Sequence, residues 1–525
     1  MATKPTLTSN GDQTGIVEPL TLTFPATLFA RLYEHLFPGD DDEHGAVVAA
    51  GVARTPHGTR LLAREVLLAE DGKHYVAGQR GYHMLAANFV RDAALYCRDE
   101  SLCYLAVHNH GGWDHVGFSA DDFASHERGY PALLDLLRGR AVGALVLARE
   151  AIAGDIWWRG GRASLTAAKI LGQPIRFLRP APISAAGTDT TFSRQSWLLG
   201  DRGQAILQDL HVGVIGAGGV GSLLVEYLAR VGVGHLTVAD PDILEISNLP
   251  RVVDAGVDDV APHALGSSWR KWLQLPGRPR RAQPPTPRPK VQITERVARR
   301  ANPRVTFTGV QGDFLTPAVA VQFLDCDYLF LAADSMRCRL LYNAITAQYL
   351  IPGAQVGSKA SVEKATGRLL DVFSVVRPAS PGAGCLWCNG LIPPGRLQEE
   401  AATEDERTAQ RYVEDPTVVA PSVITLNAVG AAHAANEFLF SVTGLARPEI
   451  GPLPYRRVNA LTGEMILEEP RADPRCPECS PDPGSRLGRG DDPRWPLPMR
   501  EPASMVGAML STTSFDRSSR IGRSK

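Results

Sequence analysis

The sequence predicts two α/β domains, the second of which is built on a doubly wound sheet. At 525 residues the chain is too long for a single hydrophobic core. Over residues 20–180, short apolar runs such as AVVAAGVA and LCYLAVH alternate with helix-like stretches, which is typical of a compact α/β domain. After residue 190 the order becomes strand, Gly-rich turn, helix and strand, which predicts the doubly wound sheet.

The domain boundaries follow changes in composition. The stretch PAPISAAGTDTT is polar and rich in small residues, so we expect a linker at 181–190 and the second domain over 191–480. A Pro- and Arg-rich stretch at about 256–288 interrupts that domain and resembles a surface insertion. Residues 481–525 are rich in Pro, Gly, Ser and Arg, and we expect a mostly disordered tail there.

The overall charge and hydropathy exclude some classes of partner. Lys and Arg total 55 and Asp and Glu total 56, so net charge gives no reason to expect nucleic acid or an anionic membrane. The first twenty residues lack the apolar core of a signal peptide, and no apolar run is long enough to cross a bilayer. We therefore expect a cytoplasmic protein with no membrane or nucleic-acid partner.

The eight cysteines fall into two groups. Two C-x-x-C pairs in a cytosolic chain favour a structural zinc site over disulfides, and their members are Cys385, Cys388, Cys476 and Cys479. The other four stand apart from one another and are most simply buried small hydrophobic residues: Cys97, Cys103, Cys326 and Cys338.

The stretch HNHGGWDHVGFSADD, residues 108–122, carries a possible metal site. On a strand, His108 and His110 project to the same face and provide two ligands for one ion. A catalytic zinc needs a third ligand, which Asp122 or its neighbour Asp121 can supply, and an open position for water. Zinc lowers the pKa of that water to about 7, and a nearby carboxylate suits the proton transfer that follows. His126, farther along, is expected to be a surface histidine.

This order of His-x-His, short loop and Ser-x-x-Asp resembles the signature of the JAMM (MPN/JAB) metalloproteases. Glu43, in DDEHGAVVAAGVA, matches the glutamate that the family places just before an apolar strand. The resemblance implies zinc ligation by His108, His110 and Asp122, proton transfer by Glu43, and stabilisation of the water and the oxyanion by Ser119.

The JAMM family cleaves peptide or isopeptide bonds after the C-termini of ubiquitin-like proteins, and the resemblance implies that activity here. The loop before Ser119 is one residue longer than usual, so Asp121 stays an alternative ligand to Asp122. A degenerate domain that only binds is the alternative to a protease.

The stretch GAGGVG, residues 216–221, predicts a phosphate-binding turn between a strand and a helix. Its glycines allow backbone N–H groups to approach a phosphate, and they are Gly216, Gly218, Gly219 and Gly221. Asp240 ends the next strand at the position that binds a ribose, which alone would indicate NAD. No lysine follows the glycines, so a P-loop is excluded.

Residues farther along favour ATP over NAD. Asn248 and Arg251 follow the ribose acid, Lys290 starts a later helix, and Asp334 follows another strand. The pyrophosphate of NAD is held by backbone groups and does not require such side chains. A triphosphate under attack needs cations for its phosphates and a carboxylate for Mg²⁺.

This set resembles the ubiquitin-activating-enzyme superfamily in its ThiF/MoeB-type form, from about Thr191 to Cys479. The resemblance implies a Rossmann-like domain that adenylates the C-terminal carboxylate of a ubiquitin-like or sulfur-carrier protein. It assigns the ribose to Asp240 and Mg²⁺ to Asp334, and it assigns structural zinc to the four paired cysteines. The phosphates fall to Asn248, Arg251 and Lys290. Arg194 matches an arginine that reaches into a partner subunit's site, which implies a homodimer.

The combined prediction is a bifunctional enzyme that processes or removes a ubiquitin-like protein and also activates its tail. Between residues 389 and 423 there is no cysteine to form a thioester, so the acceptor is expected to be a separate conjugating enzyme or a sulfur donor. The alternatives are sulfur-carrier activation for cofactor or metabolite synthesis, a first domain that is only a scaffold, and an NAD-dependent oxidoreductase.

Overall fold

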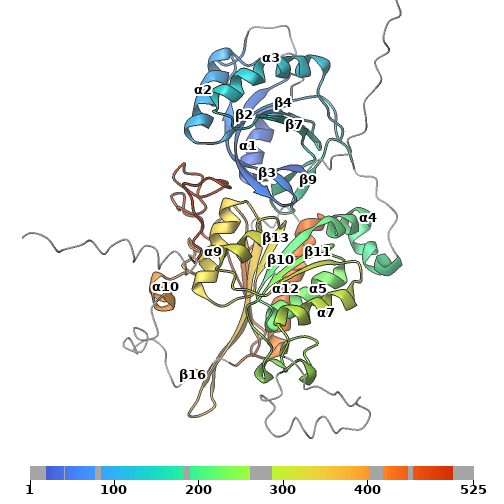
Figure 1. Ribbon diagram of the computed structural model, residues 1–525, viewed down its shortest axis with the longest axis vertical. Coiled ribbons are helices and arrows are strands. Elements are labelled where there is room, and N and C mark those ends of the chain that lie inside the picture. The colour runs from blue at the N-terminus through green and yellow to red at the C-terminus, as the bar shows by residue number, and fades with distance from the viewer. Residues whose placement is uncertain are drawn as a thin grey trace, which may run out of the picture.

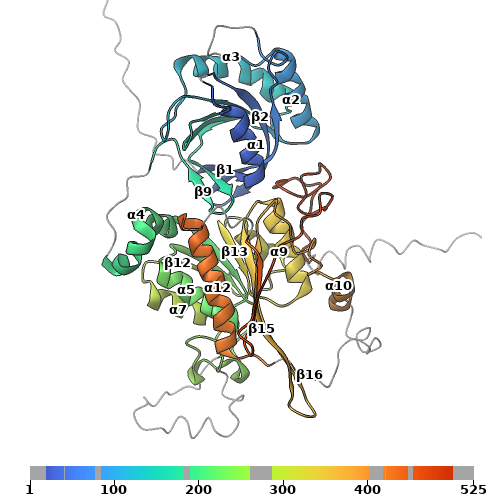
Figure 2. The same cartoon turned by 180° about the vertical axis from the view of Figure 1, so that it is seen from behind.

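The computed structural model describes residues 19–40, 42–76, 84–182, 190–260, 287–401, 418–419, 421–446 and 453–500. They form two sheets, each the centre of one domain (Figure 1). The N-terminal domain lies at one end of the long axis, with α3 on its side farthest from the second domain and α2 along its flank (Figures 1 and 2). Among these residues, no helix has both the length and the apolarity needed to cross a membrane.

The N-terminal sheet has the strand order β7-β6-β5-β4-β2-β3-β1-β8-β9. Its strands are β1 (Leu20–Pro25), β2 (Gly45–Thr55), β3 (Gly58–Leu68), β4 (Cys103–Asn109), β5 (Val142–Leu147), β6 (Ile152–Trp158), β7 (Gly161–Ser164), β8 (Ala167–Leu171) and β9 (Arg176–Leu178). Its helices are α1 (Ala26–Leu36), α2 (Ala87–Asp99) and α3 (Ala120–Leu136).

Strand β2 shows why this sheet is apolar on both faces. Ala46 and Val48 pack into the core that contains α1, whereas Val47 and Ala49 pack into the core that contains α2 and α3. Successive side chains of a strand point to opposite faces, so a strand covered on both sides reads as a continuous apolar run. That explains the AVVAA run in the sequence.

The second sheet begins with five parallel strands in the order β12-β11-β10-β13-β14 and continues antiparallel through β15, β17 and β18. These strands are β10 (His211–Ile215), β11 (His235–Ala239), β12 (Thr306–Val310), β13 (Tyr328–Leu331), β14 (Gly353–Glu363), β15 (Leu369–Ala379), β17 (Tyr455–Asn459) and β18 (Met465–Glu468), with β16 (Val418–Val419) beside β14. The parallel part confirms the predicted α/β sheet, and the antiparallel extension was not predicted.

The helices of the second domain follow the expected alternation with strands. They are α4 (Ser193–Asp209), α5 (Gly219–Val231), α7 (Lys290–Ala301), α8 (Pro317–Ala320), α9 (Met336–Gln348), α10 (Pro394–Ala401) and α12 (Ile424–Thr443), with short 3-10 turns at Thr190–Phe192, Ile246–Asn248, Val257–Asp259 and Val321–Phe323. Helix α12 packs against α5 and α4, as Figure 2 shows.

The two domains meet at the amino-terminal ends of the parallel strands. Arg60 of β3 is buried and donates to the carbonyl oxygens of Leu324 at 2.9 Å and Cys326 at 3.3 Å. Lys169 of β8 pairs with Asp327, just before β13. Since ligands of open α/β sheets bind at the carboxyl ends of the strands, this contact leaves those ends free.

One predicted boundary is wrong. Residues 481–500 belong to the expected disordered tail, but the structure describes them as packed, with Ser485 and Leu487 buried. Composition misjudged them because they are held mainly through backbone groups rather than apolar side chains. Residues 501–525, most of the expected linker (183–189) and most of the expected insertion (261–286) lie outside the described residues.

Candidate functional site

The first candidate site lies at the carboxyl end of β4. His108 is on that strand and His110 follows it, while Asp122 is in the first turn of α3. Strand β2 pairs with β4 so that Gly45 faces His108, which brings Glu43 to the same place. Four residues separated by up to 79 positions in the sequence therefore meet in one cluster.

The geometry of this cluster fits a metal ion. One ligand atom from each of His108, His110 and Asp122 lies within 4.8 Å of the others. The two Nε2 atoms are 3.1 Å apart, and Asp122 Oδ1 is 3.7 Å from His108 Nε2. Tetrahedral zinc with bonds of about 2.0–2.1 Å separates its nitrogen ligands by about 3.3 Å. Glu43 Oε1 lies 3.7 Å from His110 Nε2, at the side of the cluster.

The structure places Asp122, and not Asp121, with the histidines. Asp121 is exposed, whereas Asp122 Oδ2 accepts hydrogen bonds from the backbone N–H and the hydroxyl of Ser119, each at 2.7 Å. Burial alone would raise the pKa of Asp122, but the bonds from Ser119 and the nearby histidines lower it. Burial also lowers the pKa of His108 to about 4. At neutral pH the site therefore offers an ionised carboxylate and a neutral imidazole, as metal binding requires.

His126 is buried, contrary to the expected surface position. Its Nδ1 lies 2.8 Å from Asp155 Oδ2, and Arg162 donates to the other carboxylate oxygen at 2.6 Å. The His126 ring also meets Phe118 edge-on at 5.1 Å, and Phe118 lies 6.2 Å from the His108 ring. No sequence motif indicated Asp155 or Arg162, which come from β6 and β7.

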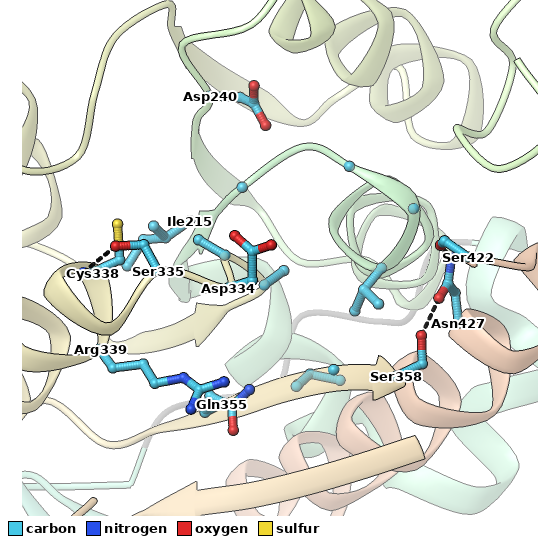
Figure 3. A pocket seen from close by; sticks show the side chains of 18 of the residues that line it. Ile215, Asp240, Asp334, Ser335, Cys338, Arg339, Gln355, Ser358, Ser422 and Asn427 are labelled. Carbon is cyan, nitrogen blue, oxygen red and sulfur yellow. Dashed lines mark hydrogen bonds between the residues drawn. The ribbon is translucent and has the colours of Figure 1, made fainter. Parts of the chain in front are cut away.

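The second candidate site is a cavity of about 750 Å³ at the carboxyl ends of β10 and β13 (Figure 3). Gly216, Gly218 and Gly219 line it, and Asp240 stands at the end of β11. A Cβ on Gly221 would lie 1.8 Å from the carbonyl oxygen of Gly216, so only glycine allows this tight turn. Asp240 Oδ2 accepts from the backbone N–H of Ala217 at 2.7 Å and so holds the turn in place.

Three of the predicted phosphate and metal residues also line this cavity: Arg251, Lys290 and Asp334. Lys290 is buried and donates to Asp242 Oδ2 at 2.6 Å, and its Nζ lies 3.9 Å from Asp240 Oδ1. In Figure 3 Asp334 lies between Asp240 and Arg339. A cavity of this size, with cations and a carboxylate on its wall, suits a nucleotide.

Three predicted residues do not line the cavity: Gly221, which closes the glycine turn, Asn248 and Arg194. Asn248 is buried, and its Oδ1 accepts from the backbone N–H of Glu245 at 3.1 Å. It thereby caps the 3-10 turn that precedes Arg251. Arg194 is exposed on α4.

Several lining residues carried no sequence motif. They are Arg339, Gln355, Ser358, Arg377 and Asn427, which come from α9, β14, β15 and α12. The Nδ2 atom of Asn427 would be 2.3 Å from a Cβ on Gly219, so this amide explains why a glycine is needed at position 219.

Arg339 and Arg377 form an electropositive end of the cavity. Within the described residues, neither guanidinium has a carboxylate oxygen within 4.0 Å, and the Nε of Arg339 is buried without a hydrogen-bond acceptor. Arg377 donates to Gln355 Oε1 at 2.6 Å. Burial, and then repulsion by Arg339, lower the pKa of Arg377 to about 10. Two arginines arranged in this way favour an anionic ligand.

Cys338 also lines the cavity, at the start of α9, although no thioester cysteine was predicted. Burial raises the pKa of its thiol to about 11, so it stays protonated at neutral pH. A protonated thiol is a poor nucleophile.

The four paired cysteines converge as predicted. Their Sγ atoms lie within 4.8 Å of one another, with separations of 3.7 Å for Cys385–Cys388, 3.8 Å for Cys385–Cys476 and 3.5 Å for Cys388–Cys479. Zinc–sulfur bonds of about 2.3 Å give tetrahedral edges of about 3.8 Å, so the donor set fits zinc. The other four cysteines are buried, as expected.

Comparison with known proteins bears on the second domain. Residues 192–264, which include the glycine turn, Asp240 and Arg251, match the model of the ThiF family. This part of the second domain is therefore similar to the ThiF family. The match begins at residue 192, so the JAMM-type interpretation of the first domain rests on its motif and its geometry.

Three curated relatives match parts of the chain. The sulfur carrier protein ThiS adenylyltransferase of Bacillus subtilis is 30% identical over 223 residues, 39% of this chain and 56% of that protein. The SAMP-activating enzyme E1 of Haloferax volcanii is 50% identical over 62 residues, 12% of this chain and 23% of that protein. The tRNA threonylcarbamoyladenosine dehydratase of Escherichia coli is 27% identical over 168 residues, 32% of this chain and 53% of that protein. The chain thus spans about half the length of these relatives, or less.

Proposed function

We propose that the ThiF-type domain activates the C-terminal carboxylate of a ubiquitin-like or sulfur-carrier protein by ATP-dependent adenylation. The observation that carries this proposal is the cavity, which holds the glycine turn, two cations and Asp334 around one space. Two of the similar proteins are named as an adenylyltransferase of a sulfur carrier and as an E1 activating enzyme.

The charged residues predicted from the sequence that line the cavity each have a role in this reaction. Asp240 binds the ribose, and Arg251 and Lys290 neutralise the phosphates, where charge grows as pyrophosphate leaves. Asp334 would hold Mg²⁺, which supplies further neutralisation of the triphosphate. One oxygen of the incoming carboxylate attacks the α-phosphorus, and the bond from that phosphorus to the β-phosphate oxygen breaks.

Arg339, Arg377 and Gln355 bind the carboxylate to be activated. They lie in the same cavity as the glycine turn but belong to different elements from the phosphate residues. A fixed pair of guanidiniums orients a carboxylate through directed N–H bonds, and such orientation lowers the entropic part of the barrier.

The first domain is proposed to hydrolyse the bond that follows a ubiquitin-like C-terminus. His108, His110 and Asp122 would hold zinc, which supplies a bound water of lowered pKa. Glu43 takes the proton from the attacking water and passes it to the leaving amine. Ser119 orients Asp122 through its two hydrogen bonds.

One tail then serves both domains, because hydrolysis by the first would expose the carboxylate that the second activates. Removal of the modifier from finished conjugates is the other use of the same chemistry. The acceptor of the activated tail is proposed to be a separate conjugating enzyme or a sulfur donor, because the burial of Cys338 disfavours a thioester there.

A homodimer in which Arg194 reaches the partner's cavity stays a prediction.

Pyrophosphate exchange into ATP tests the adenylation directly. The protein is mixed with ATP, labelled pyrophosphate and the ubiquitin-like or sulfur-carrier proteins encoded near it. Exchange that needs a free C-terminal carboxylate and is lost in Asp334→Ala supports the proposal. Asp254→Asn is the matched control, since Asp254 pairs with Arg296 at the surface and should leave exchange unchanged. Exchange that Asp334→Ala retains would contradict the assigned site.

A further inference from the structure

The segment 480–500, here called the strap, runs between the two domains (red-brown beside α9 in Figure 1). Its backbone donates to the second domain, from Gly488 N to Ala347 O at 3.0 Å and from Gly490 N to Gln348 O at 2.9 Å. It also donates to the first domain, from Asp491 N to the carbonyl of Val52 at 2.7 Å. The strap therefore bonds to both domains within four residues.

The fit between the strap and β2 is specific. A Cβ on Gly51 would lie 2.1 Å from the carbonyl oxygen of Gly488. Gly490 has a φ of +57°, and a Cβ there would lie 2.1 Å from the carbonyl oxygen of Val52. Glycines on both surfaces allow a close approach that a side chain would prevent, so this contact is a built interface.

Docking of the strap carries an electrostatic cost. Arg64 of β3 is buried and donates to the carbonyl oxygens of Asp482 at 2.6 Å and of Leu487. The strap adds a second buried guanidinium, Arg489, which is paired with Glu100 at 2.9 Å. Burial, followed by the charge of Arg489, lowers the pKa of Arg64 to about 10. Burying two guanidiniums side by side costs desolvation and mutual repulsion, which the nearby carboxylates of Glu65, Glu100 and Asp492 offset only in part, so docking gains from a further source of stability.

The four-cysteine cluster is the natural anchor. Cys479 immediately precedes the strap, whereas Cys385 and Cys388 lie between β15 and α10 of the second domain. A metal ion shared by these thiolates ties the start of the strap to the second domain. The strap is then held close to its docking surface, so its effective concentration there is high, which offsets the electrostatic cost of docking.

We propose that metal binding by the four cysteines keeps the strap docked, and that the strap couples this metal site to both candidate catalytic regions. On one side the strap bonds to β2 and to Glu100 at the end of α2. On the other, Arg500 donates to Leu315 O at 2.7 Å and pairs with Asp313 at 2.9 Å. Asp313 lines the nucleotide cavity, so the strap reaches its wall. This inference stands apart from the proposed adenylation, since it concerns the folded chain without substrates.

Hydrogen–deuterium exchange of the full-length protein tests the coupling. The amides of Gly488, Gly490, Asp491 and Arg500 report the docked strap. In Cys479→Ser, with zinc content measured in parallel, we expect these amides to exchange at least tenfold faster, as should the amide of Arg54, which bonds to Asp491. The amides of α5 should keep their protection, which would show that the domain stays folded.

Two further variants separate the alternatives. Asp122→Asn alters the other metal cluster and should leave the strap protected. Arg489→Gln should retain zinc at the cysteines but loosen the strap, because the loss of the bonds from Arg489 to the carboxylate and the carbonyl of Glu100 outweighs the relief of its repulsion with Arg64. If Cys479→Ser does not fold, the wild type stripped of zinc by a chelator takes its place, with Asp122→Asn treated in the same way. Strap amides that stay protected after the cysteine site loses its metal would overturn the proposal.

Discussion

The two candidate sites differ in construction and in where they face. The histidine cluster is small, and its ligand side chains are about one-fifth exposed, whereas the nucleotide site is a cavity of about 750 Å³. Both lie at strand ends away from the contact between the domains. Strand β2 starts beside His108 and ends at Thr55, which donates to Asp325 at 2.5 Å at the domain contact. Strand β10 begins on the other side of this contact and ends at the glycine turn.

This arrangement separates the sites by a long path. Strand β2 has 11 residues and β10 has five. At about 3.3 Å per residue, the path along these two strands is on the order of 50 Å long. A short C-terminal tail held in one site therefore does not reach the other in the same chain. The difference teaches that, under the proposed function, a cut tail is released before the second domain activates it, and that each site can be disabled alone.

The largest expected effect concerns the first site. Glu43→Gln should lower the hydrolysis of a ubiquitin-like precursor by about 10²–10⁴-fold, because the amide no longer takes the proton from the attacking water. Zinc content should stay unchanged, since Glu43 is not one of the three clustered ligands. Intact-mass spectrometry of the precursor measures the rate. A parallel fall in pyrophosphate exchange would show that the two sites do not act independently.

The matching change in the second site is Lys290→Ala. We expect pyrophosphate exchange to fall by about 10²-fold, because a buried cation that neutralises the phosphates is lost. Precursor hydrolysis should continue at the wild-type rate. Lys290→Arg tests whether charge alone suffices. An effect of Lys290→Ala on hydrolysis would mean that the two regions communicate.

The electropositive end of the cavity sharpens the comparison within the second domain. Arg377→Gln should raise the KM for the carboxylate partner about tenfold while the affinity for ATP changes less than twofold, because Arg377 is assigned to the acid. Arg377→Lys should recover only part of the loss, since it keeps the charge but not the planar fork. A weaker affinity for ATP in Arg377→Gln would assign this arginine to the phosphates instead.

The smallest expected effect is on stability. Burial alone would raise the pKa of Asp155, but hydrogen bonds from His126, Arg162 and Trp157 lower it from 3.8 to about 2. A depressed pKa stabilises the fold above about pH 4, and that contribution, about 2 kcal/mol, is lost as the pH falls toward 2. Urea unfolding followed between pH 5 and pH 2 measures the slope. In Asp155→Asn the stability lost between pH 5 and pH 2 should be smaller by that amount, and an unchanged loss would contradict the assignment.

Local motifs predicted much of this molecule. GAGGVG, the C-x-x-C pairs and His-x-His place their functional atoms within a few residues of one another, so spacing alone was informative. Arg377 and Asn427 were missed because β15 and α12 bring them to the cavity from far along the chain. His126 and the strap were misjudged for a related reason. The burial of His126 depends on its contact with Asp155, and the packing of the strap depends on the backbone of β2. Neither contact can be read from amino-acid composition.

The most direct test of the central claim mixes two disabled proteins. Glu43→Gln and Asp334→Ala are combined with ATP, pyrophosphate and a full-length ubiquitin-like precursor, and the tail mass and the exchange rate are recorded. Because the cut tail is released, the mixture should trim and activate the precursor at close to the wild-type rate. The wild type is used at a concentration that gives the same number of working sites of each kind. If wild type performs both reactions and the mixture trims without activating, the tail passes directly between sites in one chain, which would contradict this account.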